Sequence, residues 1–110
     1  MIRQSLDAGA AHAFMLVSTG KGLAFQRRTV TGGTSTHTSG GAGTAPRWVK
    51  LTRQGDVITA SVSSNGTSWT VVRQEALSIS GAVHVGLAVT SHVYGKLATA
   101  TFDNVTVTPR

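Results

Sequence analysis

Residues 47–73, with the sequence RWVKLTRQGDVITASVSSNGTSWTVVR, constrain the fold of this chain more than any other stretch. Three runs of strand-forming residues are separated here by two turn signals, Gln54-Gly55-Asp56 and Asn65-Gly66. Asn-Gly between such runs is typical of a two-residue type I′ hairpin turn, because both central residues adopt positive φ and Asn and Gly do so at least cost. The stretch therefore predicts an antiparallel meander of three strands, onto which the other strands should pair.

A period-two alternation runs through the same stretch and predicts which side chains face a core. The core row should consist of Val49, Leu51, Ile58, Ala60 and Val62. Trp48, Lys50 and Thr52 should point the other way, which leaves Trp48 on the exposed side. For Trp69, which follows the Asn-Gly turn, packing into the core is favoured over a role in ligand binding.

Further strands are predicted on both sides of the meander. Residues 12–18 and 23–29 should form a hairpin around a glycine-rich turn at residues 19–22. In the second of these strands, Leu23, Phe25 and Arg27 share one face, and Ala24, Gln26 and Arg28 share the other. The remaining strands are expected at residues 1–6, 77–80, 82–91 and 97–107, with the strongest apolar row in 82–91 and a bulge at Asp103-Asn104.

Residues 31–46 (TGGTSTHTSGGAGTAP) are rich in Gly, Ser and Thr and nearly free of apolar side chains. Such a run buries too little surface to offset its ordering entropy, so a long loop is predicted, either ligand-binding or a flexible connector. No stretch shows helical periodicity, and many short strands with glycine-rich turns favour an all-β, antiparallel β-sandwich. The length fits a single domain, residues 1–110, with a modest core.

Ten Lys and Arg against four Asp and Glu give a net charge of +6, which attracts polyanions non-specifically. The basic residues are dispersed, with Arg27-Arg28 the one adjacent pair, so no specific nucleic-acid interface is predicted. No apolar run approaches the roughly 20 residues that span a bilayer, so no membrane association is expected. The first residues lack the apolar core of a signal peptide, which indicates either a cytoplasmic protein or a leader outside this sequence.

The titratable residues do not form a catalytic or metal-binding pattern. A glycosidase needs two facing carboxylates, and two on one strand would have i, i+2 spacing. The four carboxylates (Asp7, Asp56, Glu75 and Asp103) show no such spacing. The four histidines (His12, His37, His84 and His92) lack the spacing of metal ligands, and there is no Gly-x-Ser-x-Gly nucleophile motif. We therefore expect no catalytic residue, no metal and no cofactor; a small hydrolase is the third and most distant interpretation.

Candidate ligand-binding residues come from the aromatic side chains and from the polar strand faces. An indole or phenol ring can stack on the apolar face of a sugar, and planar donors can bind hydroxyls or carboxylates. The candidates are Trp48, Tyr94, His92, Arg28, Gln26 and Arg3. The alternative for the polar members is an ordinary solvated strand face.

Five segments resemble concanavalin A-like (laminin-G-like) β-sandwich modules, which bacteria append to secreted sugar-active enzymes and surface proteins. They are MIRQSLDAGAAHAFMLV, GLAFQRR, WVKLTRQGDVITASVSSNGTSW, VHVGLAVTSH and ATFDNV. The resemblance implies a jelly roll of two curved antiparallel sheets, glycan binding on the concave face or rim loops, and secretion. The turn Ser63–Trp69 is similar to the family's Ser-x-Asp-Gly-x-x-Trp turn, with Asn65 in the Asp place, which argues against a carboxylate ligand there.

One departure from the family pattern leads to a second functional hypothesis. The usual module carries several strands before the segment that corresponds to Met1-Ile2-Arg3, so this chain matches its C-terminal portion. The open sheet should expose unpaired backbone groups and an apolar face, which predicts a homodimer or larger assembly. Strand exchange between copies is one way in which such an assembly could form. Two functions are therefore expected as alternatives: a non-catalytic module that binds a glycan or polysaccharide weakly, and a structural module that associates with itself without binding sugar.

Overall fold

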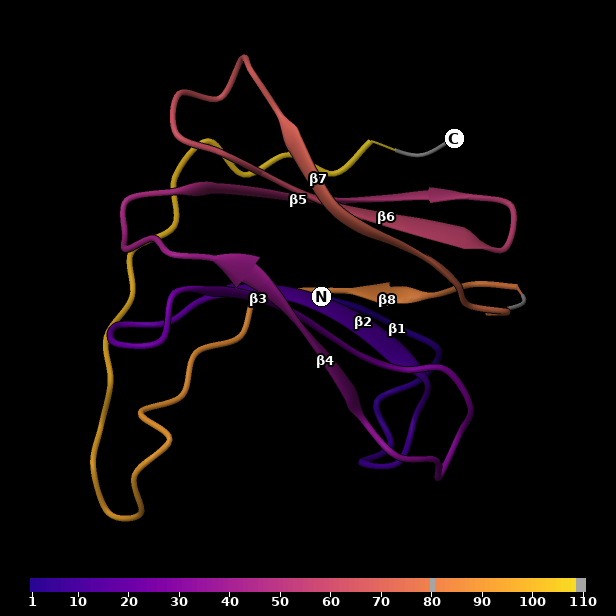
Figure 1. Cartoon of the computed structure of the whole chain (residues 1–110). Coiled ribbons are helices and arrows are strands. Elements are labelled where there is room, and N and C mark those ends of the chain that lie inside the picture. The colour runs from indigo at the N-terminus through magenta and orange to yellow at the C-terminus, as the bar shows by residue number, and fades with distance from the viewer. Residues whose placement is uncertain (80, 109–110) are drawn as a thin grey trace.

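The computed structural model describes residues 1–79 and 81–108, in which eight strands form two antiparallel sheets. The five-stranded sheet has the order β4-β3-β2-β1-β8, and the three-stranded sheet has the order β5-β6-β7. The strands are β1 (Ile2–Arg3), β2 (His12–Val17), β3 (Leu23–Arg28), β4 (Thr36–Gly41), β5 (Trp48–Gln54), β6 (Val57–Ser63), β7 (Thr70–Ala76) and β8 (His84–Val85). The two sheets lie as two layers, one above the other (Figure 1). The predicted all-β class is confirmed.

The core lies between the two layers and follows the predicted alternation. Phe25 of β3 and Ile58 of β6 are fully buried, and the core also contains Ile2, Ala11, Ala13, Met15, Leu23, Ala60, Val62, Leu77 and Ile79. The register pairs Val49 with Val62 and Leu51 with Ala60, so these residues share the inner face of the three-stranded sheet, as predicted. Val49 is nevertheless exposed, because the inner face is not covered over its whole length.

An ion pair crosses the core between the layers. Arg27, on the inner face of β3, is buried, and its Nε lies 3.0 Å from Oε1 of Glu75 on β7. The same guanidinium donates a 2.5 Å hydrogen bond to Oγ1 of Thr38 on β4 and lies over the ring of Phe25, 5.1 Å from the centroid. Arg73 contacts the other carboxylate oxygen at 3.7 Å. The pair thus fixes one edge of each sheet against the other.

Of the two predicted meander turns, one is confirmed and one is wrong. Gly55-Asp56 joins β5 to β6 as a two-residue turn, with Gly55 at a φ of 60°. Between β6 and β7, however, the connection is a six-residue loop, residues 64–69, in which Gly66 has positive φ and Asn65 does not. Side chains explain this wider loop: Ser63 Oγ accepts the backbone N–H groups of residues 65 and 66, and Asn65 Oδ1 accepts those of residues 67 and 68.

The long loop predicted at residues 31–46 is also partly wrong, because β4 forms within it. This edge strand pairs with β3 through backbone hydrogen bonds, which need no apolar side chains. Gly40 permits the close approach: a Cβ there would lie 3.0 Å from Cβ of Leu23. Composition alone therefore misassigned an edge strand as loop.

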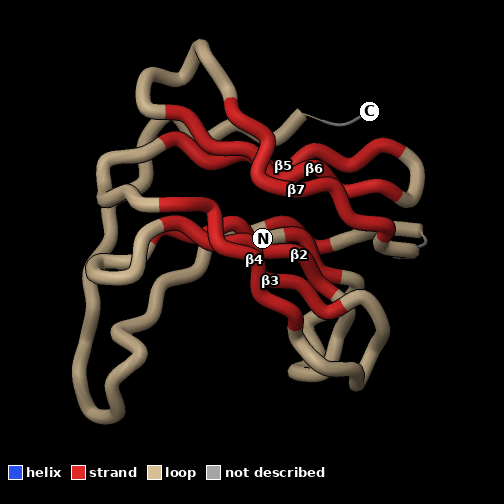
Figure 2. Tube along the Cα trace, viewed as in Figure 1, coloured by secondary structure: helices blue, strands red, loops and turns tan. Residues whose placement is uncertain are grey.

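The strands predicted toward the C-terminus are the largest error. Residues 82–91 contain only the two-residue β8, which pairs with the equally short β1, and residues 97–107 contain no strand. In Figure 2 this part of the chain is a long loop-coloured segment beside the two layers. Leu97 is fully exposed and Phe102 is 47% exposed, so this apolar row is not part of the core, and Asp103-Asn104 is not a strand bulge. The strand predicted at 77–80 is likewise missing over residues 77–79, although Leu77 and Ile79 are buried; residue 80 lies outside the described residues.

Within residues 1–79 and 81–108, no helix has the length and apolar character needed to cross a bilayer.

Candidate functional site

Both tryptophans of the chain lie by the outer face of the three-stranded sheet, Trp48 on β5 and Trp69 in the loop between β6 and β7. Trp48, the first residue of β5, pairs with Ser63 and is 36% exposed. Its indole lies on Gly66 of the 64–69 loop: a Cβ at that position would lie 2.7 Å from Cε2 of the ring. Glycine is therefore required there both for its positive φ and for space. One side of the indole rests on the loop backbone.

Lys50 shares the strand face of Trp48 and contacts the second indole, Trp69. Lys50 lies two residues after Trp48 on β5 and so shares its face. Its ammonium lies 4.2 Å from the ring centroid of Trp69, a cation–π contact. Trp69 is half-buried and is not part of the core cluster, so the prediction that it fills the core is wrong. We call Trp48, Lys50 and Trp69 the tryptophan patch.

The outer face of the five-stranded sheet carries a row of basic and histidine side chains. Register aligns His84 of β8, Arg3 of β1, His12 of β2 and Arg28 of β3 directly across four adjacent strands. Directly opposite residues in antiparallel strands point to the same side of a sheet. We call these four residues the basic row.

A second row, of mixed character, lies next to the basic row on the same face. The register aligns Phe14 of β2 with Gln26 of β3, and Gln26 with His37 of β4. The amide Nε2 of Gln26 lies 3.2 Å from Nδ1 of His37, within hydrogen-bond distance. Phe14 and Gln26 are half-buried, and His37 is exposed.

Both arginines of the basic row are held by backbone carbonyls. Arg28 donates from Nε to the carbonyl of Gly33 and from one terminal nitrogen to the carbonyl of Ala8, each at 2.9 Å. Arg3 donates to the carbonyls of Ser5, at 3.1 Å, and Asp7, at 2.6 Å. Among the described residues neither guanidinium forms an ion pair with a carboxylate. The two guanidiniums are therefore fixed in place by backbone carbonyls and not by direct pairing with a carboxylate.

His12 lies between these charges and responds to them. Burial lowers the pKa of His12 below its usual value, and the positive charges of Arg3 and Arg28 lower it further. A 3.2 Å hydrogen bond to the carbonyl of Ala10, which acts in the opposite direction, requires Nδ1 to carry a proton. In the neutral imidazole the other ring nitrogen, Nε2, is then an acceptor.

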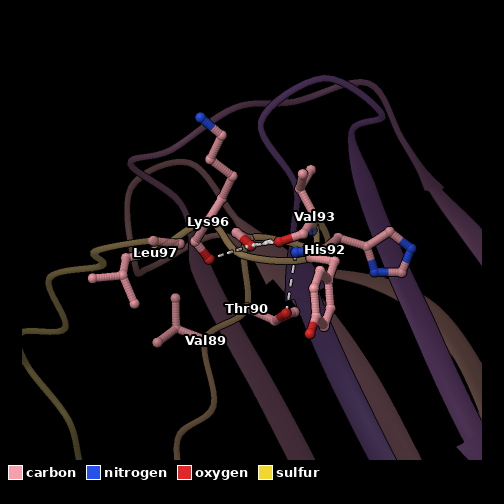
Figure 3. A pocket seen from close by; sticks show the side chains of 9 residues that line it. Val89, Thr90, His92, Val93, Lys96 and Leu97 are labelled. Atoms are coloured by element: carbon pink, nitrogen blue, oxygen red, sulfur yellow. Dashed lines mark hydrogen bonds between the residues drawn. The ribbon is translucent and has the colours of Figure 1, made fainter.

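Tyr94 and His92 lie elsewhere, in an open hollow formed by residues 89–94 and 96–98 of the C-terminal segment. Thr90 Oγ1 accepts the backbone N–H of His92 at 3.1 Å, and His92 has a φ of 60°. In Figure 3 the side chains of His92 and Lys96 point outward in different directions, and Val89 and Leu97 lie on one side of the hollow. The polar groups of this hollow do not converge on one point.

The six predicted ligand-binding residues are therefore divided among three places. Arg3, Gln26 and Arg28 share the outer face of the five-stranded sheet, Trp48 lies in the tryptophan patch, and His92 and Tyr94 lie in the C-terminal hollow. Sequence reasoning missed the partners that complete two of these places. Lys50 and Trp69 were assigned to an exposed face and to the core respectively, and His12 was considered only as a metal ligand. Strand parity placed Lys50 correctly, but its contact with Trp69 depends on the loop conformation.

The acidic residues contribute little to either face. Glu75 is held between Arg27 and Arg73 in the core region, and Asp7, Asp56 and Asp103 are exposed on three different connecting segments. Among the residues described in the structure, no group of three His, Asp or Glu side chains could hold a metal ion.

These features define an all-β protein with two antiparallel sheets and polar or aromatic outer faces. Comparison with protein-family models, with curated proteins and with solved structures finds no match, so no family is identified for the chain.

Proposed function

We propose that this protein is a non-catalytic carbohydrate-binding module, built on a concanavalin A-like β-sandwich of jelly-roll type. The observation that carries the proposal is the tryptophan patch, which presents an exposed indole, an ammonium group and a second indole at one sheet face. Trp48 and Lys50 lie on the regular strand β5, which holds them in fixed positions, and Trp69 is contributed by the adjoining loop 64–69.

The chemistry of the patch suits a sugar. A pyranose ring has an apolar face of C–H groups, which stacks on the π face of an indole, and polar edges that need hydrogen-bond partners. One face of the Trp48 indole rests on the backbone of Gly66, so a sugar would stack on the opposite face. The ammonium of Lys50 offers three donors to sugar hydroxyls from beside the Trp69 ring. A platform of this kind, open to solvent, should bind weakly.

The test is affinity electrophoresis against a panel of neutral polysaccharides, with starch, xylan, mannan and a soluble cellulose derivative as members. At least one should retard the protein, and Trp48→Ala should weaken that binding about ten-fold, as loss of a central aromatic contact does. Val71→Ala is the matched control, because Val71 is exposed and points to the same side of the sheet. The proposal fails if no member of the panel retards the protein, or if Trp48→Ala and Val71→Ala behave alike.

Self-association is the second candidate function, and exposed apolar residues in the C-terminal segment favour it. Eight large apolar side chains between residues 87 and 107 are each at least 47% exposed: Leu87, Val89, Val93, Tyr94, Leu97, Phe102, Val105 and Val107. Exposed apolar groups in this number and proximity in sequence are typical of interaction surfaces. The three-stranded sheet also has two edge strands, β5 and β7, whose backbone groups can accept a further strand.

Size-exclusion chromatography with light scattering should then give a mass of at least two chains that rises with protein concentration. Leu97→Asp should shift the protein toward the monomer, because a carboxylate in an apolar interface loses its hydration. Val30→Asp, which places the same charge on an exposed valine outside the segment, should leave the mass unchanged. A monomer at every concentration would rule out this function.

A further inference from the structure

We propose that the outer face of the five-stranded sheet is a second binding surface, and that it takes anionic groups, carboxylate or sulfate, carried by a polysaccharide. The basic row and the neighbouring Gln26 form this surface. The inner faces of the two sheets pack on each other, so this surface and the tryptophan patch face opposite sides of the molecule. The inference shares its class of ligand with the proposed function but depends on different residues.

Regular spacing is the first reason for the assignment. Neighbouring strands lie about 4.8 Å apart, so the four members of the basic row follow one another at that interval across β8, β1, β2 and β3. A polymer that carries a negative charge on successive units can meet the guanidiniums of Arg3 and Arg28, two intervals apart, and the imidazoles of His12 and His84 at once. A single small anion would use only one or two of them.

Positive charge held in place is the second reason. Arg3 and Arg28 are anchored by neutral carbonyl oxygens, which fix the guanidiniums without cancelling their charge. Burial is the main cause of the lowered pKa of His12, and the positive charges of Arg3 and Arg28, between which His12 lies in the register, lower it further. An anion placed there can accept charge-assisted hydrogen bonds from the guanidinium N–H groups that do not donate to these carbonyls, on side chains that the carbonyls already hold in position. Side-chain ordering costs little in such a site.

The face is less suited to nucleic acid. Single strands bind by stacking successive bases on aromatic side chains within a basic groove. On this face the described strands contribute one aromatic ring, Phe14, and it is half-buried. Gln26 and His37 instead supply amide and imidazole groups beside the row, which suit hydroxyls.

The experiment compares three dextrans with one backbone and different charge: dextran, carboxymethyl dextran and dextran sulfate. Isothermal titration should show binding to one or both charged dextrans that weakens with salt, and much weaker binding to dextran. Arg28→Gln should reduce affinity for the charged dextran about ten-fold, the size expected for loss of a hydrogen bond between charged groups. Lys21→Gln removes the same charge from an exposed turn and should change the affinity less than about two-fold.

Because Arg28 also holds two loops, a second variant tests the site without disturbing them. His84→Glu changes an exposed side chain of β8 and places a carboxylate opposite Arg3. It should reduce the affinity for the charged dextran at least as much as Arg28→Gln does. The control Gln54→Glu adds the same negative charge at an exposed position of the other sheet, so it should reduce the affinity only through the lower net charge of the protein. Circular dichroism and urea unfolding establish that each variant is folded.

The outcomes separate this inference from the proposed function. Loss of charged-dextran binding in His84→Glu but not in Trp48→Ala supports an anion-binding site on the five-stranded sheet. This holds whether or not the protein binds any of the neutral polysaccharides. Carboxymethyl dextran and dextran sulfate distinguish a carboxylate from a sulfate ligand. Equal effects of site and control variants, no binding to either charged dextran, or equally tight binding of poly(dT) with the same sensitivity to His84→Glu would overturn it.

Discussion

Replacing Arg27 with alanine should lower the free energy of unfolding by about 3 kcal/mol, toward the lower end of the range for breaking a buried ion pair. The Arg27 side chain is 3% exposed, and Glu75 is 22% exposed. Removal of the guanidinium leaves a largely desolvated carboxylate with only the 3.7 Å contact to Arg73. It also removes the hydrogen bond to Thr38, which joins β4 to the same network. The expected loss is a large fraction of the roughly 5–15 kcal/mol that stabilises a domain.

Urea unfolding measures this effect as a lower midpoint with an unchanged slope. Arg73→Ala is the matched control: it contacts the same carboxylate, but its side chain is 48% exposed, so the cost should stay below about 1 kcal/mol. Replacing both partners, Arg27→Met with Glu75→Leu, should recover most of the lost stability, because no charge is then left buried and alone. Equal effects of Arg27→Ala and Arg73→Ala would show that the inter-sheet pair is not desolvated.

Replacing Ile58 with alanine should lower the free energy of unfolding by a similar amount, about 3 kcal/mol, as lost apolar burial plus a cavity. Ile58 lies on β6, the central strand of the three-stranded sheet, and is fully buried against the other layer. The residues directly opposite it are Arg53 on one side and Glu75 on the other, so no directly paired apolar side chain lies beside the cavity.

The adjacent residue gives the control for this prediction. Val57 precedes Ile58 on β6 and points to the other side of the sheet, with 41% exposure. Val57→Ala should cost less than about 1 kcal/mol in the same urea experiment, because its side chain keeps part of its contact with water in the folded state and lies outside the core. If the two substitutions were equally costly, the layers would not be packed through β6 as the structure describes.

The confirmed predictions share one property: each rests on residues that are close in sequence. The parity of Leu23, Phe25 and Arg27 placed all three on the buried face of β3, and the Gly55-Asp56 turn joined β5 to β6 with two residues. Alternation acts between a residue and its second neighbour, and a tight turn within four residues, so both can be recognised without knowledge of the rest of the chain.

The errors occurred where a strand depends on a distant partner. The segment Thr36–Gly41 lacks apolar residues but pairs along β3, whereas residues 97–107 have an apolar row but find no strand partner among the described residues. A strand is stable only when its backbone groups are paired, and pairing depends on which edge is available and how long it is. The two-residue length of β1 limits β8 in this way.

Composition and periodicity by themselves determined that this chain is an all-β protein and which residues of its central strands face inward. The tertiary structure decided the rest: the ion pair between Arg27 and Glu75, 48 residues apart, and the alignment of Arg3, His12 and Arg28 on one outer face. The physical reason is that the pleat of a strand decides, within a few residues, to which face each side chain points. Which side chains of different strands become neighbours depends on the register between segments that are distant in sequence.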